Sequence, residues 1–409
     1  MVPNGWQIKT VGHLFEVQLG KMLNKIAKEK YPQYQYLGNS DVRWGYFNLS
    51  DLKSMYFNER EMDKFTLKDG DVLMCEGGEV GRCAVWNGGE TSIYYQKALH
   101  RLRGKGGIVP EYFQFYMSFI NGTKLLDDFS TKTSIAHLTR EKLLELPVKT
   151  PPLTEQRKIA QILSTWDKAI ATTEKLIDAS KQQKKALMQQ LLTGKKRLID
   201  PETGKAFEGD WEEVKLSKLF ARVTEKNKGQ SANVVTISAQ HGLIRQEEFF
   251  KKSIASETLD NYFILRKGQF AYNKSYSNGY PMGAIKRLNR YDDAVVTSLY
   301  ICFEIKNSAH TSSCFMEQYF ESGLLNRGLT KVAAEGGRAH GLLNVKPTDF
   351  MGLALVVPEI KEQQKIASVL TAADKEIELL EAKLAHFKQE KKALMQQLLT
   401  GKRRVPLSS

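Results

Sequence analysis

The residue types best suited to recognition chemistry gather in turn-rich segments. Residues 76–82 read EGGEVGR and residues 273–281 read NKSYSNGYP. Glycine lets a backbone approach a ligand closely, while lysine, tyrosine and asparagine can contact phosphates, stack on rings or hydrogen-bond to base edges. Residues 130–134 and 335–340 have a similar character. We expect these four segments to be ligand-contacting loops; the alternative is that they are ordinary surface turns.

The charge balance indicates what such loops would contact. The chain has 60 Lys and Arg against 46 Asp and Glu, a net charge of +14. A surplus of this size favours binding to a polyanion by counterion release, and nucleic acid is the commonest polyanion in a cell. The alternative is a basic protein without a nucleic-acid role. The candidate DNA-contacting residues are Arg43, Arg82, Lys97, Lys132, Thr133, Gln240, His241, Lys274, Tyr276, Asn278, Arg338 and His340.

Catalytic motifs are missing from the sequence. It contains no P-loop, no G-x-G-x-x-G between a strand and a helix, no H-E-x-x-H and no Asn/Asp-Pro-Pro-aromatic element, and its seven histidines are scattered. The four cysteines are spaced C-x7-C and C-x11-C without a histidine at ligand spacing, so we expect buried free thiols and no metal site. We therefore predict no catalytic residue and no cofactor in this chain.

An internal repeat is the strongest signal in the sequence. Residues 182–197 read QQKKALMQQLLTGKKR and residues 389–404 read QEKKALMQQLLTGKRR, so that 14 of 16 positions agree at an offset of 207. The same offset relates Glu155 to Glu362 and Asp167 to Asp374. The regions between these segments repeat only weakly, with Trp6 recurring as Trp211. One part of the chain therefore performs the same task twice, while the other part has diverged.

Both repeated segments are predicted to be long helices of about 38 residues, or roughly 57 Å. Their apolar residues recur at steps of four and three, which is typical of a coiled-coil seam. Gly194 and Gly401 suit the helix C-termini, and prolines precede both helices. The predicted seam residues are Ile159, Leu163, Trp166, Ile170, Ile177, Leu187, Leu191, Ile366, Leu370, Ile377, Leu384, Leu394 and Leu398.

The partner expected for each helix is the other copy, in an antiparallel pair. In that register Ile159 faces Leu398 and Trp166 meets Lys391; the alternative is that each helix packs on its own domain. Met188, Gln189, Gln190 and their copies Met395, Gln396 and Gln397 lie outside the seam and are predicted to dock a partner, unless they merely persist from a recent duplication. The predicted organisation is a first domain at 1–152, a helix at 153–194, a basic linker at 195–208, a second domain at 209–358 and a helix at 359–401.

Together these features resemble the specificity subunits of type I restriction–modification systems. The resemblance rests on residues 151–156 (PPLTEQ), on residues 185–194 (KALMQQLLTG), and on their copies at 358–363 and 392–401. Trp6 and Trp211, each opening a domain, and residues 68–71 (KDGD) also match that family. It implies a mixed α/β fold with two target-recognition domains in a pseudo-two-fold arrangement, separated by an antiparallel pair of long coiled-coil helices.

The resemblance also implies a function. Each domain would read one half of a bipartite sequence in double-stranded DNA, and the helices would dock two methyltransferase subunits. Those subunits would bind S-adenosylmethionine, and motor–nuclease subunits, with ATP and Mg, would join them; this chain would be non-catalytic. The alternatives are a free-standing, repressor-like DNA-binding protein and a stand-alone enzyme. No window of about 18 apolar residues and no secretion signal is evident, which predicts a cytoplasmic protein without a membrane span.

Overall fold

The computed structural model describes residues 2–89, 93–131, 136–249, 258–333 and 343–406. The chain divides into two compact units. The first unit contains residues 1–174 and 382–409, and the second contains residues 175–381. Each unit combines residues of one globular domain with the first part of one repeated segment and the last part of the other.

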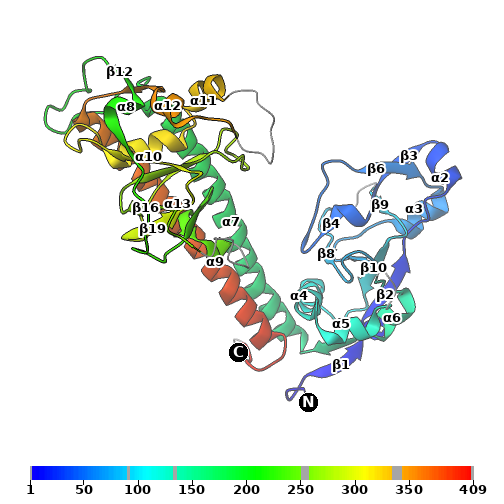
Figure 1. Ribbon diagram of the computed structural model, residues 1–409. Coiled ribbons are helices and arrows are strands. Elements are labelled where there is room, and N and C mark those ends of the chain that lie inside the picture. Colours follow the sequence, from blue (N-terminus) through cyan, green and yellow to red (C-terminus); the bar gives the residue numbers. More distant parts are fainter. Residues whose placement is uncertain (1, 90–92, 132–135, 250–257, 334–342, 407–409) are drawn as a thin grey trace. The chain divides into compact units, whose positions relative to one another are not determined.

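The first unit is built on a four-stranded antiparallel sheet in the order β2-β10-β7-β8, and a separate pair, β1-β11, joins the two ends of the domain. A smaller sheet, β6-β3-β9, lies beside helices α2 and α3 (Figure 1). The elements are β1 (Gln7–Thr10), α1 (Val11–Leu14), β2 (Phe15–Leu19), α2 (Lys25–Glu29), β3 (Gln33–Leu37), η1 (Asn39–Asp41), β4 (Val42–Arg43), β5 (Tyr46–Phe47), β6 (Lys53–Tyr56), α3 (Glu59–Phe65), β7 (Val72–Cys75), β8 (Cys83–Val85), β9 (Tyr94–Tyr95), β10 (Leu99–Gly104), α4 (Pro110–Ile120), α5 (Lys124–Phe129), α6 (Arg140–Glu145) and β11 (Pro147–Thr150).

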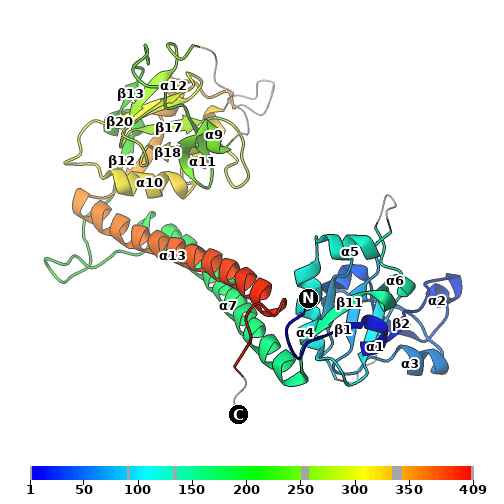
Figure 2. The ribbon, with the colours of Figure 1, turned by 90° about the horizontal axis from the view of Figure 1, so that it is seen from below.

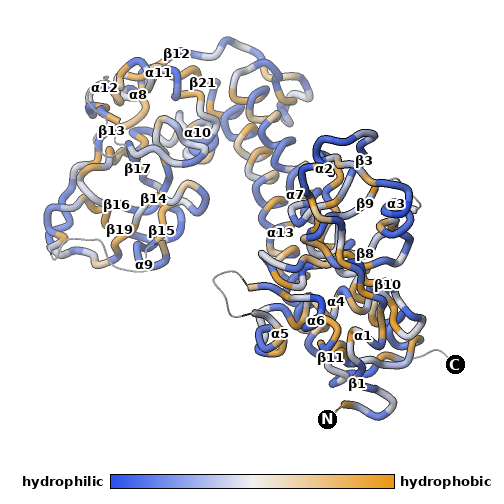
Figure 3. Tube along the Cα trace, turned by 90° about the vertical axis from the view of Figure 1, so that its right-hand side faces the viewer, coloured by the Kyte–Doolittle hydropathy of each residue, from blue (hydrophilic) through white to orange (hydrophobic). Residues whose placement is uncertain are grey.

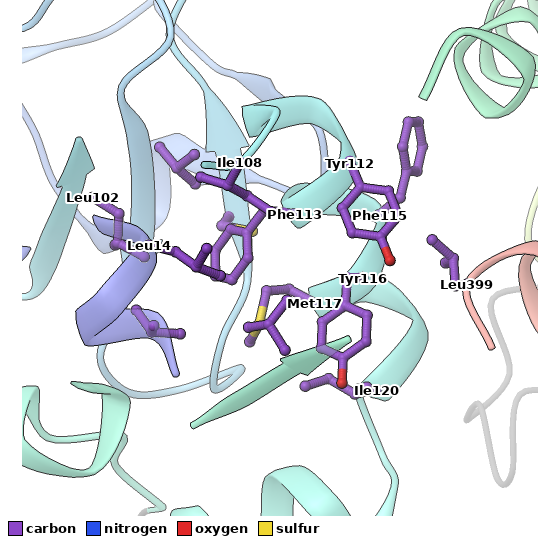
Figure 4. Packing of buried hydrophobic residues seen from close by; sticks show 14 of the residues in the cluster. Leu14, Leu102, Ile108, Tyr112, Phe113, Phe115, Tyr116, Met117, Ile120 and Leu399 are labelled. Atoms are coloured by element: carbon purple, nitrogen blue, oxygen red, sulfur yellow. The ribbon is translucent and has the colours of Figure 1, made fainter. Parts of the chain in front are cut away.

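Helix α4 carries the core of this unit. Pro110 occupies its first turn, where a missing N–H costs nothing, and its apolar side chains Phe113 and Met117 are fully buried. Figure 4 shows these residues packed with Leu14 of α1 and Leu102 of β10, and with Leu399, which follows the second long helix. The core of the first unit is therefore completed by a residue almost 300 positions away from α4 in the sequence.

The second unit repeats this topology. Its four-stranded sheet has the order β13-β20-β17-β18, and the pair β12-β21 joins its ends. The mixed α/β fold with a duplicated domain is thus confirmed, although the domain sequences have diverged. The elements are β12 (Glu212–Lys215), α8 (Leu216–Leu219), β13 (Phe220–Val223), β14 (Val235–Ser238), β15 (Gly242–Arg245), α9 (Gln246–Phe249), β16 (Phe263–Arg266), β17 (Phe270–Asn273), β18 (Ala284–Arg287), β19 (Asp293–Val296), β20 (Ile301–Ile305), α10 (Ser313–Glu321), α11 (Asn326–Val332), α12 (Pro347–Met351) and β21 (Ala354–Val357).

Two 39-residue helices, α7 (Leu153–Leu191) and α13 (Ile360–Leu398), correspond to the repeated segments. They run side by side (Figures 1 and 2), and hydrophobic and hydrophilic positions alternate along both (Figure 3). Within each unit the N-terminal half of one helix packs antiparallel on the C-terminal half of the other, as the pairs Asp167–Lys391 and Asp374–Lys184 show. All thirteen predicted seam residues are buried or half-buried. The helix ends also pack on the domain cores, so both packing alternatives occur together.

Ion pairs explain the lysine that interrupts both seams. In the first unit Lys391 binds Asp167, and in the second unit the equivalent Lys184 binds Asp374. Lys391 binds the neighbour of Trp166, and the Trp166 ring packs edge-on against Phe387, at 5.5 Å between centroids. Lysine at these positions therefore carries a directional charge pair that specifies the antiparallel register.

The residues after each helix fasten it to the domain of the other repeat. In the first unit Arg404 binds the carboxylate of Glu155 at 2.7 and 2.8 Å, and the indole of Trp6 donates to the same carboxylate. In the second unit Arg197 and Trp211 bind Glu362 in the same way. These contacts explain why tryptophan opens each domain and why arginine closes each repeat.

Reversing one seam charge should weaken only the unit that contains it. We expect Lys391→Glu to place two carboxylates side by side and to lower the free energy of unfolding of the first unit by about 1 kcal/mol, because the half-exposed Asp167 is screened by water. Adding Asp167→Lys should restore most of the loss. Urea unfolding of the single and double variants measures both effects, and a double variant no more stable than Lys391→Glu would contradict this register.

None of the helices within the described ranges is both long enough and apolar enough to cross a lipid bilayer.

Candidate nucleic-acid interface

The first domain brings residues 76–82 next to residues 137–138 at one end of its large sheet. Strand β7 ends at Cys75 beside the start of β10, and residues 76–82 follow. Leu138 N donates to Glu76 O at 2.7 Å, and Gly77 bridges to His137. A Cβ at position 77 would lie 2.6 Å from the His137 ring, so glycine permits this close approach. The loop 76–82 therefore adjoins the segment that follows residues 130–135.

Two of the three charged side chains of the first loop, Glu79 and Arg82, bind each other. Arg82 donates to Asn39 Oδ1 at 2.8 Å and to Glu79 at 3.2 Å, and Glu79 also accepts from the indole N–H of Trp44 at 2.5 Å. Arg82 is consequently mostly buried and holds the loop to the turn at residues 38–41. Of the other candidate residues here, Arg43 and Lys97 are exposed, whereas Lys132 and Thr133 lie outside the described residues.

The second domain repeats this junction with different side chains. Strand β17 ends at Asn273, and Leu343 N donates to Lys274 O at 3.0 Å, which reproduces the Leu138–Glu76 bond. The loop is held by the Tyr280 hydroxyl, which donates to Glu321 at 2.6 Å, and by Lys286, which binds the same carboxylate. In both domains the residue that follows the last strand of this junction therefore accepts a backbone hydrogen bond from a leucine far along the chain, Leu138 in the first domain and Leu343 in the second.

The loop at residues 273–281 of the second domain offers more free side chains than the loop at residues 76–82 of the first domain. Lys274 is half-buried, and Asn278 and Tyr276 are exposed, the latter by 65%. Gln240 and His241 are exposed in the turn between β14 and β15, while Arg338 and His340 lie outside the described residues. Lysine can contact a phosphate, and an exposed tyrosine or asparagine can contact bases.

Titratable groups of the two cores are not arranged for catalysis. Burial raises the pKa of Cys75 and raises the pKa of Cys302 to about 12, so these thiols stay protonated, whereas Cys314 is exposed, unlike the buried thiol expected from the sequence. Burial also lowers the pKa of His100, whose Nε2 lies 3.1 Å from Leu138 O. Within the described ranges no three His, Cys, Asp or Glu side chains gather as metal ligands do.

Comparison with known proteins agrees with this duplicated architecture. Residues 3–182 match the family described as the type I restriction modification DNA specificity domain. Over 430 residues the chain is 24% identical to a putative type I restriction enzyme specificity subunit, MjaX, from Methanocaldococcus jannaschii, covering 99% of this chain and 95% of the relative. The MjaVIII specificity subunit of that organism is also 24% identical, with coverage of 99% and 94%. Over nearly its whole length the chain is therefore similar to type I restriction–modification specificity subunits, and residues 3–182 match their DNA specificity domain.

Solved structures show the same fold. The S subunit of a type I system from M. genitalium superposes with a TM-score of 0.58 at 15% identity, covering 97% of each chain. The HsdS subunit of Thermoanaerobacter tengcongensis gives a TM-score of 0.51 at 15% identity, covering 98% of each chain. The specificity-subunit fold, with its pair of long helices, is therefore confirmed at low sequence identity.

Most residues repeated in the two long helices have a structural task. Leu191, Leu192 and their copies are buried, and the threonines that follow bond back to helix carbonyls. Met188 and Met395, which we predicted to dock a partner, pack half-buried against the cores. We call six residues that are identical and exposed in both copies the repeated exposed face: Lys185, Gln189, Gln190, Lys392, Gln396 and Gln397. These six side chains make no hydrogen bond or ion pair within the described part of the chain, so the fold does not account for their identity.

Several residues that shape the interface were not found from the sequence. Asn39 and Trp44 lie some 40 positions before the loop that they hold, and Glu321 lies about 40 positions after Tyr280. His137 contacts Gly77 across 60 positions. No spacing within one sequence reveals such partners. The sequence marks these sites only by the matching pair of turn-rich segments in each half of the chain.

Proposed function

We propose that this chain is a specificity subunit that reads a bipartite sequence in double-stranded DNA, with one half-site for each domain. The observation that carries the proposal is the repeated loop junction, Leu138–Glu76 in one domain and Leu343–Lys274 in the other. The backbone arrangement is the same, but the side chains differ. A shared backbone scaffold that carries different side chains is what the recognition of two different base sequences requires.

The two loops differ in chemical character. The first carries Glu76, and a carboxylate accepts well from the exposed amino group of cytosine. The second carries Lys274, Tyr276 and Asn278, which suit phosphate, stacking and adenine contacts. We therefore assign different base preferences to the two domains.

The repeated exposed face supports the docking of two identical partners, one for each copy. We propose that these partners are methyltransferase subunits, which would bind S-adenosylmethionine, and that motor–nuclease subunits with ATP and Mg join them. The chain itself would bind no cofactor and would act in the cytoplasm. Glutamine and lysine side chains on one helical face can form a polar interface that is presented twice.

Reconstitution tests this proposal. The chain is co-expressed with a type I methyltransferase subunit from the same source, and the mass of the purified complex is measured. We expect two methyltransferase subunits for each chain, with methylation of DNA by the complex and none by the chain alone. Methyl transfer by the purified chain alone would refute the assignment.

Replacing Lys274 should affect one half-site only. If the lysine contacts a base, we expect Lys274→Ala to weaken binding to the target roughly 5- to 50-fold. If it contacts a phosphate, we expect the slope of log affinity against log salt concentration to become smaller by about 1. Lys267→Ala is the matched control, because Lys267 precedes β17 at the opposite end and makes only an exposed ion pair. Competition with duplexes altered in one half-site measures the effect, and altered preference in both half-sites would contradict it.

A further inference from the structure

A short segment of the first domain exposes an unusual combination of side chains. Residues 21–31 read KMLNKIAKEKY, with four lysines and one glutamate. Met22, Ile26 and Tyr31 are exposed by 56%, 65% and 76%. Single exposed apolar residues are normal, but three large ones within ten residues, interleaved with lysines, form a patch that folding leaves uncovered.

The segment is held in place by its own contacts. Asn24 caps α2 by accepting from Ala27 N at 2.8 Å, and Ala27 is buried. Lys21 is buried and binds Glu61 at 2.5 Å, and Lys30 lies over the ring of Tyr56 at 4.6 Å. Figure 1 shows α2 beside β3 and β6. The exposed apolar side chains are therefore presented by an anchored element.

Most of the exposed charges of this segment are positive. Lys25 and Lys28 are exposed, and neither makes an ion pair within the residues that the structure describes. Glu29 is the only acidic residue between positions 21 and 31. The patch is thus complementary to a polyanion, and its apolar residues suit the sugars and base edges that a groove exposes.

The segment lies at the sheet end that carries the candidate interface. Gly20 N donates to Leu99 O, and Lys97 N donates to Lys21 O at 2.8 Å, so residues 20–21 adjoin the start of β10. The loop 76–82 leaves β7 at this same end. Because Arg82 is bound within that loop, residues 21–31 supply positive charge that the loop lacks.

We propose that residues 22–31 form a DNA-contacting wedge of the first domain. Lys25 and Lys28 neutralise phosphates, while Ile26 and Tyr31 lie against sugars or bases in a groove. This inference rests on the proposed function, because the ligand is the duplex that the subunit reads. The corresponding stretch of the second domain, residues 224–233, reads TEKNKGQSAN and has no large apolar residue, so the wedge belongs to the first domain alone.

Two double variants of the full chain, each in complex with the methyltransferase subunit, test the wedge. They are Lys25→Ala/Lys28→Ala and Ile26→Ser/Tyr31→Ser, with Lys105→Ala as the control at the opposite end of β10. The probe is a duplex carrying the sequence that the wild-type complex methylates. We expect the lysine variant to lose about tenfold in affinity with a salt slope smaller by about 2. The Ile26/Tyr31 variant should lose at least tenfold with an unchanged slope, and the control should bind like wild type.

Thermal unfolding verifies that each variant is folded, as the exposure of all four side chains predicts. Variants that bind the duplex as wild type does would overturn the wedge and leave the proposed function intact. Variants that keep DNA affinity but lose the methyltransferase subunit would also overturn it, because the patch would then bind protein. A wild-type complex without sequence-dependent binding would refute the proposed function, and the wedge with it.

Discussion

Removing residues 399–409 is expected to unfold the unit formed by residues 1–174 and 382–409, while the unit formed by residues 175–381 keeps its structure. The removed segment completes the first core: Leu399 is fully buried, and Val405 is 7% exposed. Its loss also leaves the buried carboxylate of Glu155 without Arg404, although the indole of Trp6 still donates to it. A domain at the start of the chain thus depends on the last residues of the chain.

The expected loss is large. Each buried Leu or Val side chain contributes about 1.5–3 kcal/mol, and an unpaired buried carboxylate costs roughly 2 kcal/mol when its partner is half-exposed, as Arg404 is. The total of about 5 kcal/mol or more is comparable with the whole stability of a typical domain.

Hydrogen exchange on the truncated chain measures the loss unit by unit. We expect α4 and β10 to lose protection while α10 and β17 retain it. Truncation after Pro406, which keeps Leu399, Arg404 and Val405, is the control. Equal loss of protection in both units, or in neither, would contradict the division of the chain into these units.

Reversing the charges of Lys185 and Lys392 together is expected to dissociate the methyltransferase subunits without unfolding the chain. These lysines are repeated and exposed, and they make no ion pair within the described residues. Reversing a charge at a complementary interface costs several kcal/mol, so we expect each site to lose roughly 10- to 1000-fold in affinity. Each single variant should lose one of the two subunits.

Native mass spectrometry of the purified complexes measures this stoichiometry. Lys175→Glu is the matched control, because Lys175 is an exposed lysine of the same helix whose repeat equivalent is Ala382. The control complex should keep two subunits. If the double variant also kept both subunits, the repeated exposed face would not be the docking surface.

The parts of the fold that sequence reasoning found are those with regular periodicity. A stripe of apolar residues over more than four heptads predicts long helices because helical geometry is local, and a fixed offset of 207 identifies their copies. The predicted helices at 153–194 and 359–401 begin and end within three residues of the ends of α7 and α13. The antiparallel pairing of the two helices was predicted, but the ion pair between Glu155 and Arg404 was not, since these residues are 249 positions apart.

The site could be predicted only as a set of loops. Glycine-rich turns such as residues 76–82 mark places where backbone and ligand can approach, but they do not show which charges remain free. Arg82 looks like a DNA contact in sequence and is bound by Asn39 and Glu79 in the structure. The sequence does not mark residues 22–31 as a site, because lysines interleaved with apolar residues are also typical of a surface helix with a buried face. The exposure of Ile26 and Tyr31 in the structure distinguishes the two cases.

The most direct test of the central claim is a map of methylated adenines across a genome, made with the methyltransferase subunit expressed alone and together with this chain. The account predicts methylation of a single asymmetric sequence in two parts, separated by a gap of fixed length, only when the chain is present. Transferring the second domain, residues 209–358, from a related subunit should change one part of that sequence and leave the other unchanged. The same methylation with and without the chain would contradict its assignment as the specificity subunit.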